Sequence, residues 1–147
     1  MIIIRNFRPS DLTRVYEIET KSFKDPYHPL FLLNLYEAYH DSFFVAERNC
    51  LVVGYVIFRI LGGKGHILAL ATDPRYRKRG IGRTLMEHII NYLRERGIRE
   101  AWLEVRISNK SAIEFYKRMG FKEVGVTSSY YSDGEDAVIL SKDLNIY

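Results

Sequence analysis

The chain has 147 residues, of which 47% are hydrophobic and 27% charged, so its length and composition are those of a globular domain and exclude a disordered or collagen-like chain. A net charge of +4 suits an anionic ligand, a ribosome surface or nucleic acid, without choosing between them. With one cysteine (Cys50), no apolar run near the ~20 residues of a membrane span and no signal-peptide pattern, we expect a cytoplasmic protein without disulfide or membrane segment.

The first half of the chain predicts a strand, two helices and a hairpin. Leu12, Val15 and Ile18 fall on one helical stripe after Pro9, a residue type that favours the first turn of a helix. Two prolines three residues apart exclude regular helix over residues 25–29. In chain order, we expect a strand at 2–6, a helix from about 9 to 22, a loop at 25–29, a helix at 30–39, and hairpin strands at 43–47 and 51–61.

A glycine-rich turn over residues 62–65 leads into the second half of the chain. Ile81, Leu85 and Ile89 recur every four residues, which predicts an amphipathic helix that ends at Gly97. In chain order, we expect a strand at 66–72, this helix, a strand at 100–107, a helix at 109–119, and strands near 121–130 and 135–141.

Mixed strand and helix order predicts an α/β (α+β) fold with a central sheet and helices packed on both faces. The sequence contains no repeat, linker or low-complexity segment. We therefore expect one domain over residues 1–147.

The segment from Tyr76 to Gly82 has the features of a phosphate-binding loop. Glycines at 80 and 82 allow a ligand to approach the backbone closely, and the amides and dipole of the following helix attract an anion. Arg77, Lys78 and Arg79 add positive charge. A basic surface turn before a helix is the alternative. The spacing fits neither a dinucleotide fold nor a P-loop, because a third glycine and a Gly-Lys-Ser/Thr run are both missing.

Arg77-x-x-Gly80-x-Gly82 matches the R/Q-x-x-G-x-G/A motif of the GNAT superfamily of N-acetyltransferases. Residues 102–109 (WLEVRISN), 112–116 (AIEFY) and 130–137 (YYSDGEDA) continue the pattern, and the chain resembles the RimI and NatA branches of that superfamily, which acetylate protein N-termini. Gly65-His66-Ile67 also resembles the NatA branch. The resemblance covers residues 43–144 well and residues 1–42 loosely.

The resemblance implies the GNAT fold, a twisted mixed central sheet with two splayed parallel strands at residues 66–72 and 101–107. It also implies acetyl-CoA as cosubstrate, bound in the V between these strands. The cofactor-binding residues that it implies are Leu70, Ala71 and Thr72 for pantetheine, Arg77, Lys78, Arg79, Gly80, Ile81 and Gly82 for pyrophosphate, and Asn109, Tyr116, Lys117 and Arg118 near the acetyl group.

Acetyl transfer to an amine needs a proton acceptor for the amine and a donor for the leaving thiolate. Glu104 is the candidate base, because a carboxylate is unusual within an apolar strand, and His66 is the second candidate. Tyr116 lies where the family places its general acid. The alternatives are a carboxylate on a solvated face, a strand-end histidine and a core aromatic ring. An ordered water could relay the proton.

No metal is required by this reaction. His66 and Glu104 are the only plausible pair of metal ligands, and two ligands are too few for a structural zinc site. For the substrate, the resemblance implies that Tyr130 and Tyr131 hold the peptide N-terminus, where plain strand aromatics are the alternative. Asp25 and Tyr27 fall in the first-loop region where the NatA branch carries Glu and Tyr. Because Asp is one methylene shorter, we expect Asp25 to contact substrate rather than catalyse.

We therefore expect an enzyme, an acetyl-CoA-dependent peptide α-N-acetyltransferase that acts on the N-termini of ribosomal or nascent proteins. The alternatives are acetylation of a small-molecule amine or a lysine side chain and, from another class, a basic RNA-binding module. Aromatic and basic residues do not interleave on one strand face as in single-strand binders, so no direct nucleic acid contact is expected. We expect no membrane partner, and a monomer or homodimer.

Overall fold

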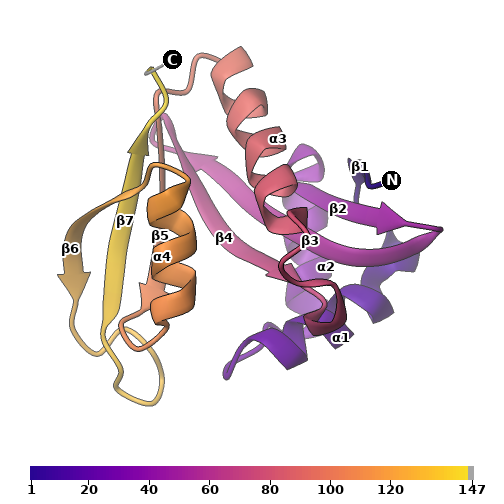
Figure 1. Cartoon of the computed structure of the whole chain (residues 1–147), viewed down its shortest axis with the longest axis horizontal. Helices are drawn as coiled ribbons and strands as arrows, with labels where there is room; N and C mark the ends of the chain where they lie inside the picture. The colour runs from indigo at the N-terminus through magenta and orange to yellow at the C-terminus, as the bar shows by residue number, and fades with distance from the viewer. Residues whose placement is uncertain (146–147) are drawn as a thin grey trace. The chain divides into compact units, whose positions relative to one another are not determined.

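The computed structural model describes residues 1–145. Within them the chain forms seven strands, four α-helices and three short 3-10 helices (Figure 1). These elements group into two compact units, the first made of residues 1–59 and 69–89 and the second of residues 60–68 and the chain from Ile90 onward. Within the described range, no helix has the length and apolar character needed to cross a membrane.

The first unit is built on antiparallel strands. It contains β1 (Ile3–Asn6), α1 (Leu12–Ser22), α2 (Pro29–Ala38) and β2 (Phe43–Arg48), with most of β3 (Leu51–Leu61) and of α3 (Ile81–Glu95) and the end of β4 (Lys64–Thr72). Strand β1 pairs with β2 and β2 pairs with β3, with Ile4 opposite Ala46 and Val45 opposite Tyr55.

Helices cover both faces of this antiparallel sheet, as two consecutive residues of β2 demonstrate. The ring of Phe43 stacks on Phe7 at 4.1 Å, and Phe7 in turn contacts Tyr36 of α2. The ring of Phe44 contacts His88 of α3 at 4.6 Å. Because successive side chains of a strand point to opposite faces, α2 and α3 pack on opposite sides of the sheet.

The second unit contains β5 (Glu100–Arg106), α4 (Lys110–Arg118), β6 (Lys122–Thr127) and β7 (Ala137–Asp143), together with the β3–β4 turn and the start of β4. Strand β7 lies between β5 and β6 and is antiparallel to both. The start of β4 runs parallel to β5, with Gly65 opposite Ala101 and His66 opposite Trp102.

Side chains of β5 alternate strictly between two environments. Those of Ala101, Leu103 and Val105 are buried, whereas the three residues between and after them (Trp102, Glu104 and Arg106) are half-buried on the opposite face. This alternation places three chemically active side chains on one face of β5. Two of them, Trp102 and Glu104, contact His66, whose strand position is fixed by its pairing with Trp102.

The structure confirms the predicted fold class, a mixed strand and helix arrangement with antiparallel strands and one parallel pair. The predicted turn at residues 62–65 is too long, because β4 begins at Lys64 and Gly65 already lies in the strand. A Cβ at Gly65 would come within 2.6 Å of the Leu93 side chain, so this glycine serves close helix packing rather than the turn. One domain over residues 1–147 stays a prediction, and its last two residues lie outside the described ones.

Candidate active site

In the second unit, the side chains of the two predicted base candidates are in direct contact. The Nε2 atom of His66 lies 2.7 Å from Oε1 of Glu104, and both side chains are shielded from solvent, with 5% and 14% of their side-chain surface exposed. The His66 ring also stacks on Trp102, with centroids 3.9 Å apart and planes within 2°. The indole therefore fixes the plane of the imidazole while the carboxylate fixes its Nε2 atom.

The Glu104 carboxylate has a second partner, because the Tyr130 hydroxyl donates to its Oε2 atom at 3.1 Å. Burial alone would raise the pKa of Glu104, but the hydrogen bond and charge of His66 and the Tyr130 hydroxyl outweigh it. The pKa of Glu104 is therefore below its ordinary value. At neutral pH this side chain is an ionised carboxylate with both oxygens engaged.

The ionised state of Glu104 determines which nitrogen of the His66 imidazole carries the proton. A carboxylate anion only accepts hydrogen bonds, so Nε2 of His66 must donate to it. In the neutral ring the remaining lone pair then lies on Nδ1. The pair therefore joins a carboxylate and an imidazole, two side-chain types that serve as general bases, in one hydrogen bond.

Tyr116, the predicted general acid, is buried on α4 with 8% of its surface exposed. Its ring meets Phe121 edge to face, with centroids 5.6 Å apart. Burial, with a smaller contribution from Tyr131, raises the pKa of the Tyr116 hydroxyl above its ordinary value. The hydroxyl therefore stays protonated across the neutral range and can donate a hydrogen bond.

The other predicted residues near the acetyl group lie at the two ends of α4. The side chain of Asn109 caps the helix, because its Oδ1 accepts from the backbone of Ala112 at 3.3 Å. The helix therefore begins at Lys110, one residue later than expected. Lys117 and Arg118 are exposed in its last turn, where cations favour the helix dipole.

The predicted pyrophosphate loop lies entirely in the first unit. Gly80 has φ of +80°, which side chains rarely adopt, and α3 begins directly after it at Ile81. Residues 77–80 are exposed, and no heavy atom lies within 4 Å of a Cβ built on Gly80. An open backbone turn at the start of a 15-residue helix, flanked by three cations, has the donor set that a pyrophosphate needs.

The side chain of Arg77 links this loop to the end of β4. Its Nε atom donates to the backbone oxygen of Thr72 at 3.3 Å, and Nη2 donates to Ser22 of α1 at 3.4 Å. Leu70 and Ala71 precede Thr72 in the final residues of β4, where the pantetheine contacts are predicted. The predicted cofactor-binding residues thus fall into a group in the first unit and a group on α4 in the second.

The first-loop residues Asp25 and Tyr27 lie between α1 and α2 in the first unit. The backbone N–H of Tyr27 donates to Oε2 of Glu19 at 2.9 Å, and the Tyr55 hydroxyl donates to Oε1 of the same carboxylate. Glu19 is 1% exposed, and its burial raises its pKa. This buried carboxylate therefore fixes the loop from which Tyr27 extends.

Glu19 and Arg106, one in each unit, contact segments that carry predicted site residues, but both were absent from the sequence prediction. Glu19 follows Val15 by four residues on the buried stripe of α1. A charged residue on an otherwise apolar stripe was the signal that could have identified it. Arg106 shares a strand face with Glu104, which period-two alternation could have revealed. Tyr130 was predicted to hold the peptide, and the structure places its hydroxyl on Glu104.

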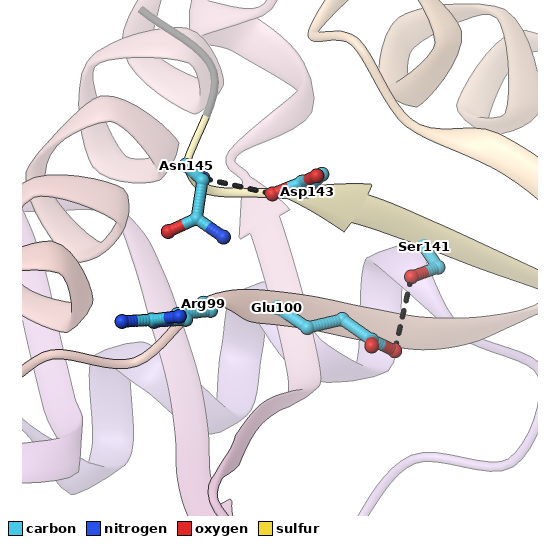
Figure 2. A pocket seen from close by; sticks show the side chains of 5 residues that line it. All are labelled: Arg99, Glu100, Ser141, Asp143 and Asn145. Atoms are coloured by element: carbon cyan, nitrogen blue, oxygen red, sulfur yellow. Dashed lines mark hydrogen bonds between the residues drawn. The ribbon is translucent and has the colours of Figure 1, made fainter.

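A polar hollow of about 300 Å³ lies elsewhere in the second unit (Figure 2). It is lined by Arg99, Glu100, Ser141, Asp143 and Asn145. Glu100 accepts a hydrogen bond from Ser141, and Asp143 accepts one from the backbone of Asn145. We assign the hollow no part in acetyl transfer. Within residues 1–145, no group of three His, Cys, Asp or Glu residues could hold a metal ion.

Comparisons with known proteins place these residues in a family. Residues 12–121 match the acetyltransferase (GNAT) family, a span that includes the pyrophosphate loop, Glu104 and Tyr116. The chain is 37% identical to an N-alpha-acetyltransferase of Sulfurisphaera tokodaii, covering 96% of this chain and 92% of the relative. It is 33% identical to the [ribosomal protein bS18]-alanine N-acetyltransferase of Escherichia coli K12, covering 99% and 100% of the two chains.

The crystal structure of Ard1 from Thermoplasma volcanium is similar over 97% of both chains, with a TM-score of 0.94 and 33% identity. The family match covers most of the chain, and the relatives extend over nearly all of it. This protein belongs to the acetyltransferase (GNAT) family and is an acetyltransferase enzyme that uses acetyl-CoA.

Proposed function

We propose that this enzyme transfers the acetyl group of acetyl-CoA to the N-terminal α-amine of proteins, ribosomal or nascent chains among them. The observation that carries this proposal is the part-buried His66–Glu104 contact, whose carboxylate also accepts a hydrogen bond from the Tyr130 hydroxyl. The relatives named N-alpha-acetyltransferase and ribosomal-protein-alanine N-acetyltransferase support the same substrate class. We place this activity in the cytoplasm, where ribosomal and nascent proteins are made.

In the proposed mechanism the α-amine attacks the thioester carbonyl and loses a proton. The His66–Glu104 pair accepts that proton, directly or through a water, and the Glu104 carboxylate stabilises the positive charge on the imidazole through its contact with Nε2. Collapse of the tetrahedral intermediate breaks the C–S bond. Tyr116, kept protonated by its burial, donates to the departing sulfur. The products are an N-acetylated chain and coenzyme A.

The proposed contacts with acetyl-CoA fall into two groups, one for its pyrophosphate and one for its pantetheine arm. The open turn at Gly80 and the first amides of α3 would bind the pyrophosphate, with Lys78 and Arg79 as counter-charges. The final residues of β4 would pair with pantetheine through their backbone. We propose Asp25, Tyr27 and Tyr131 as substrate contacts.

The experiment that tests the proposed function is incubation of the enzyme with acetyl-CoA and a panel of peptides differing in their first residue. Mass spectrometry with fragmentation locates the added acetyl group. The proposal expects a 42-dalton addition on the N-terminal residue, the mass of an acetyl group replacing hydrogen. Acetylation confined to small amines or to lysine side chains would overturn the proposed substrate, though not the acetyltransferase assignment.

A further inference from the structure

The β6–β7 loop, residues 128–136, carries both predicted peptide-contacting tyrosines and three carboxylates. The three carboxylates do not merely face solvent, because each accepts a hydrogen bond from another part of the chain. Asp133 and Glu135 accept from Arg106, and Asp136 accepts from the backbone of Ser129 at 2.8 Å. The acidic run therefore has a structural partner, and that partner is Arg106 of β5.

Arg106 contacts three residues of this loop through one guanidinium group. Its Nη1 atom donates to Oδ2 of Asp133 at 2.9 Å and to Oε1 of Glu135 at 2.8 Å. The centre of the guanidinium also lies 4.1 Å from the ring centroid of Tyr131, within the range of a cation–π contact. The side chains of Arg106 and Glu135 are 12% and 17% exposed, so their ion pair is partly shielded from solvent, whereas Asp133 is 48% exposed.

A second set of contacts joins the same loop to the residues that follow Arg106. The other carboxylate oxygen of Glu135 accepts from the backbone of Ser108 at 2.9 Å. The backbone oxygen of Asp136 accepts from Ile107 at 3.1 Å. The loop is thus docked on the end of β5 by one side chain and two backbone groups.

The internal hydrogen bonds of the loop transmit this docking to the tyrosines. The backbone N–H of Tyr131 donates to the oxygen of Glu135, and Gly134 donates back to Tyr131. The rings of Tyr130 and Tyr131 meet edge to face at 4.9 Å. When Arg106 holds Glu135, it therefore also fixes the backbone of Tyr131 and the neighbouring ring whose hydroxyl reaches Glu104.

We propose that Arg106 is a positioning residue for the amine substrate. It docks the β6–β7 loop on β5, so that Tyr131 is presented to the incoming chain and Tyr130 is held against Glu104. This inference rests on the proposed function for the identity of the substrate. Arginine suits this position better than lysine, because the planar guanidinium lies over the Tyr131 ring while its Nη1 atom donates to both carboxylates, and a compact ammonium lacks that planar face.

The test is Arg106→Lys, which keeps the charge and removes the planar contacts. We expect faster hydrogen exchange of residues 128–136 and a peptide KM raised roughly 5- to 30-fold, with the affinity for acetyl-CoA within about twofold of wild type. Arg96→Lys is the matched control. Arg96 directly follows α3, and its guanidinium lies over the ring of Tyr92 in that helix. The control should leave both the loop exchange and the peptide KM unchanged.

Asp133→Asn provides a second variant whose effect on folding is smaller, because Asp133 is half exposed. It removes one ionic partner of Arg106 and should raise the peptide KM in the same direction by a smaller factor. Unchanged loop exchange in Arg106→Lys, or equal rises in the KM of peptide and acetyl-CoA, would overturn the positioning role. If wild type acetylates no α-amine, the proposed function fails, and hydrogen exchange still decides whether Arg106 docks the loop.

Discussion

Glu104 and His66 form a part-buried pair in which the carboxylate and the imidazole nitrogen lie 2.7 Å apart. Their strands are parallel neighbours at this point, with His66 opposite Trp102, two residues before Glu104 on the same face of β5. The pairing of the strands therefore sets the distance, and the Trp102 ring sets the plane of the imidazole. If this pair accepts the proton of the amine, as proposed, the proton is shared between two side chains that are already hydrogen-bonded to each other.

Glu104→Gln should lower kcat/KM for the amine by roughly 10²- to 10⁴-fold, the range of general acid–base catalysis. Glutamine keeps the size of the side chain and loses the charge that stabilises the imidazolium. Acetyl-CoA affinity, measured by calorimetry, should not change. The double variant with His66→Gln should be little worse than the worse single variant, because the two residues act as one unit. Additive losses would mean that they act separately.

Tyr116→Phe should lower the single-turnover rate of acetyl transfer by roughly 10- to 1000-fold while leaving acetyl-CoA affinity intact. The change removes one buried hydroxyl and keeps the ring contact with Phe121. The lower end is expected if thiolate departure needs little assistance. Tyr16→Phe on α1 is the matched control. A wild-type rate in Tyr116→Phe, measured where chemistry limits turnover, would remove this residue from the mechanism.

Gly82→Val should weaken acetyl-CoA binding by at least about tenfold, or ~1.4 kcal/mol, with the fold intact. Gly82 is the second residue of α3, and a branched side chain there would intrude on the proposed pyrophosphate site. Circular dichroism checks the fold and calorimetry measures the affinity. Gly125→Val on β6 is the control, because an added Cβ there meets no atom within 4 Å. Equal affinity in Gly82→Val and wild type would show that the site is misplaced.

Acid should release the contact between Glu135 and the end of β5. Hydrogen bonds from Ser108 and Arg106 lower the pKa of Glu135 to about 2 from an ordinary value of 4.5. The folded state therefore binds fewer protons than the unfolded state between these values, so this contribution is present above pH 4.5 and is lost as the pH falls toward 2.

Urea unfolding of wild type and Glu135→Gln at pH 6 and pH 3 measures this contribution. The stability difference between the two proteins should be larger at pH 6 and should shrink at pH 3, because Glu135 of the unfolded wild type is then protonated whereas the folded state still holds it ionised. Glu123→Gln, on β6, is the control. A difference that does not depend on pH would contradict the assignment of the lowered pKa to Glu135.

Local pattern was sufficient to predict most elements and to single out two side chains that the structure brings into contact. The four-residue recurrence of Ile81, Leu85 and Ile89 predicted α3, and the structure has it at Ile81–Glu95. The sequence analysis named His66 and Glu104 as the base candidates and as a plausible pair of ligands, and the structure has the two in contact. Both inferences depend on spacing within single elements or on a pattern shared with a family.

Contacts between distant segments could not be predicted from one sequence. Arg106 meets partners 27 and 29 residues further along the chain, and no local period relates such positions. The start of β4 was misplaced because glycine at position 65 signals a turn, whereas the structure uses it for close approach of Leu93. The bond between Glu19 and Tyr55 likewise joins two elements that only the folded chain brings together.

The central claim is that the acceptor is an α-amine. At pH 7 an α-amine with a pKa near ~8 has a deprotonated fraction a few hundred times that of lysine at about 10.4, so a shielded His66–Glu104 pair suffices as base. The most direct measurement compares kcat/KM for two peptides of otherwise one sequence. One has a free N-terminus and no lysine, and the other has a blocked N-terminus and an internal lysine. We predict acetylation of the free peptide at least about a hundredfold faster; faster acetylation of the blocked peptide would contradict the claim.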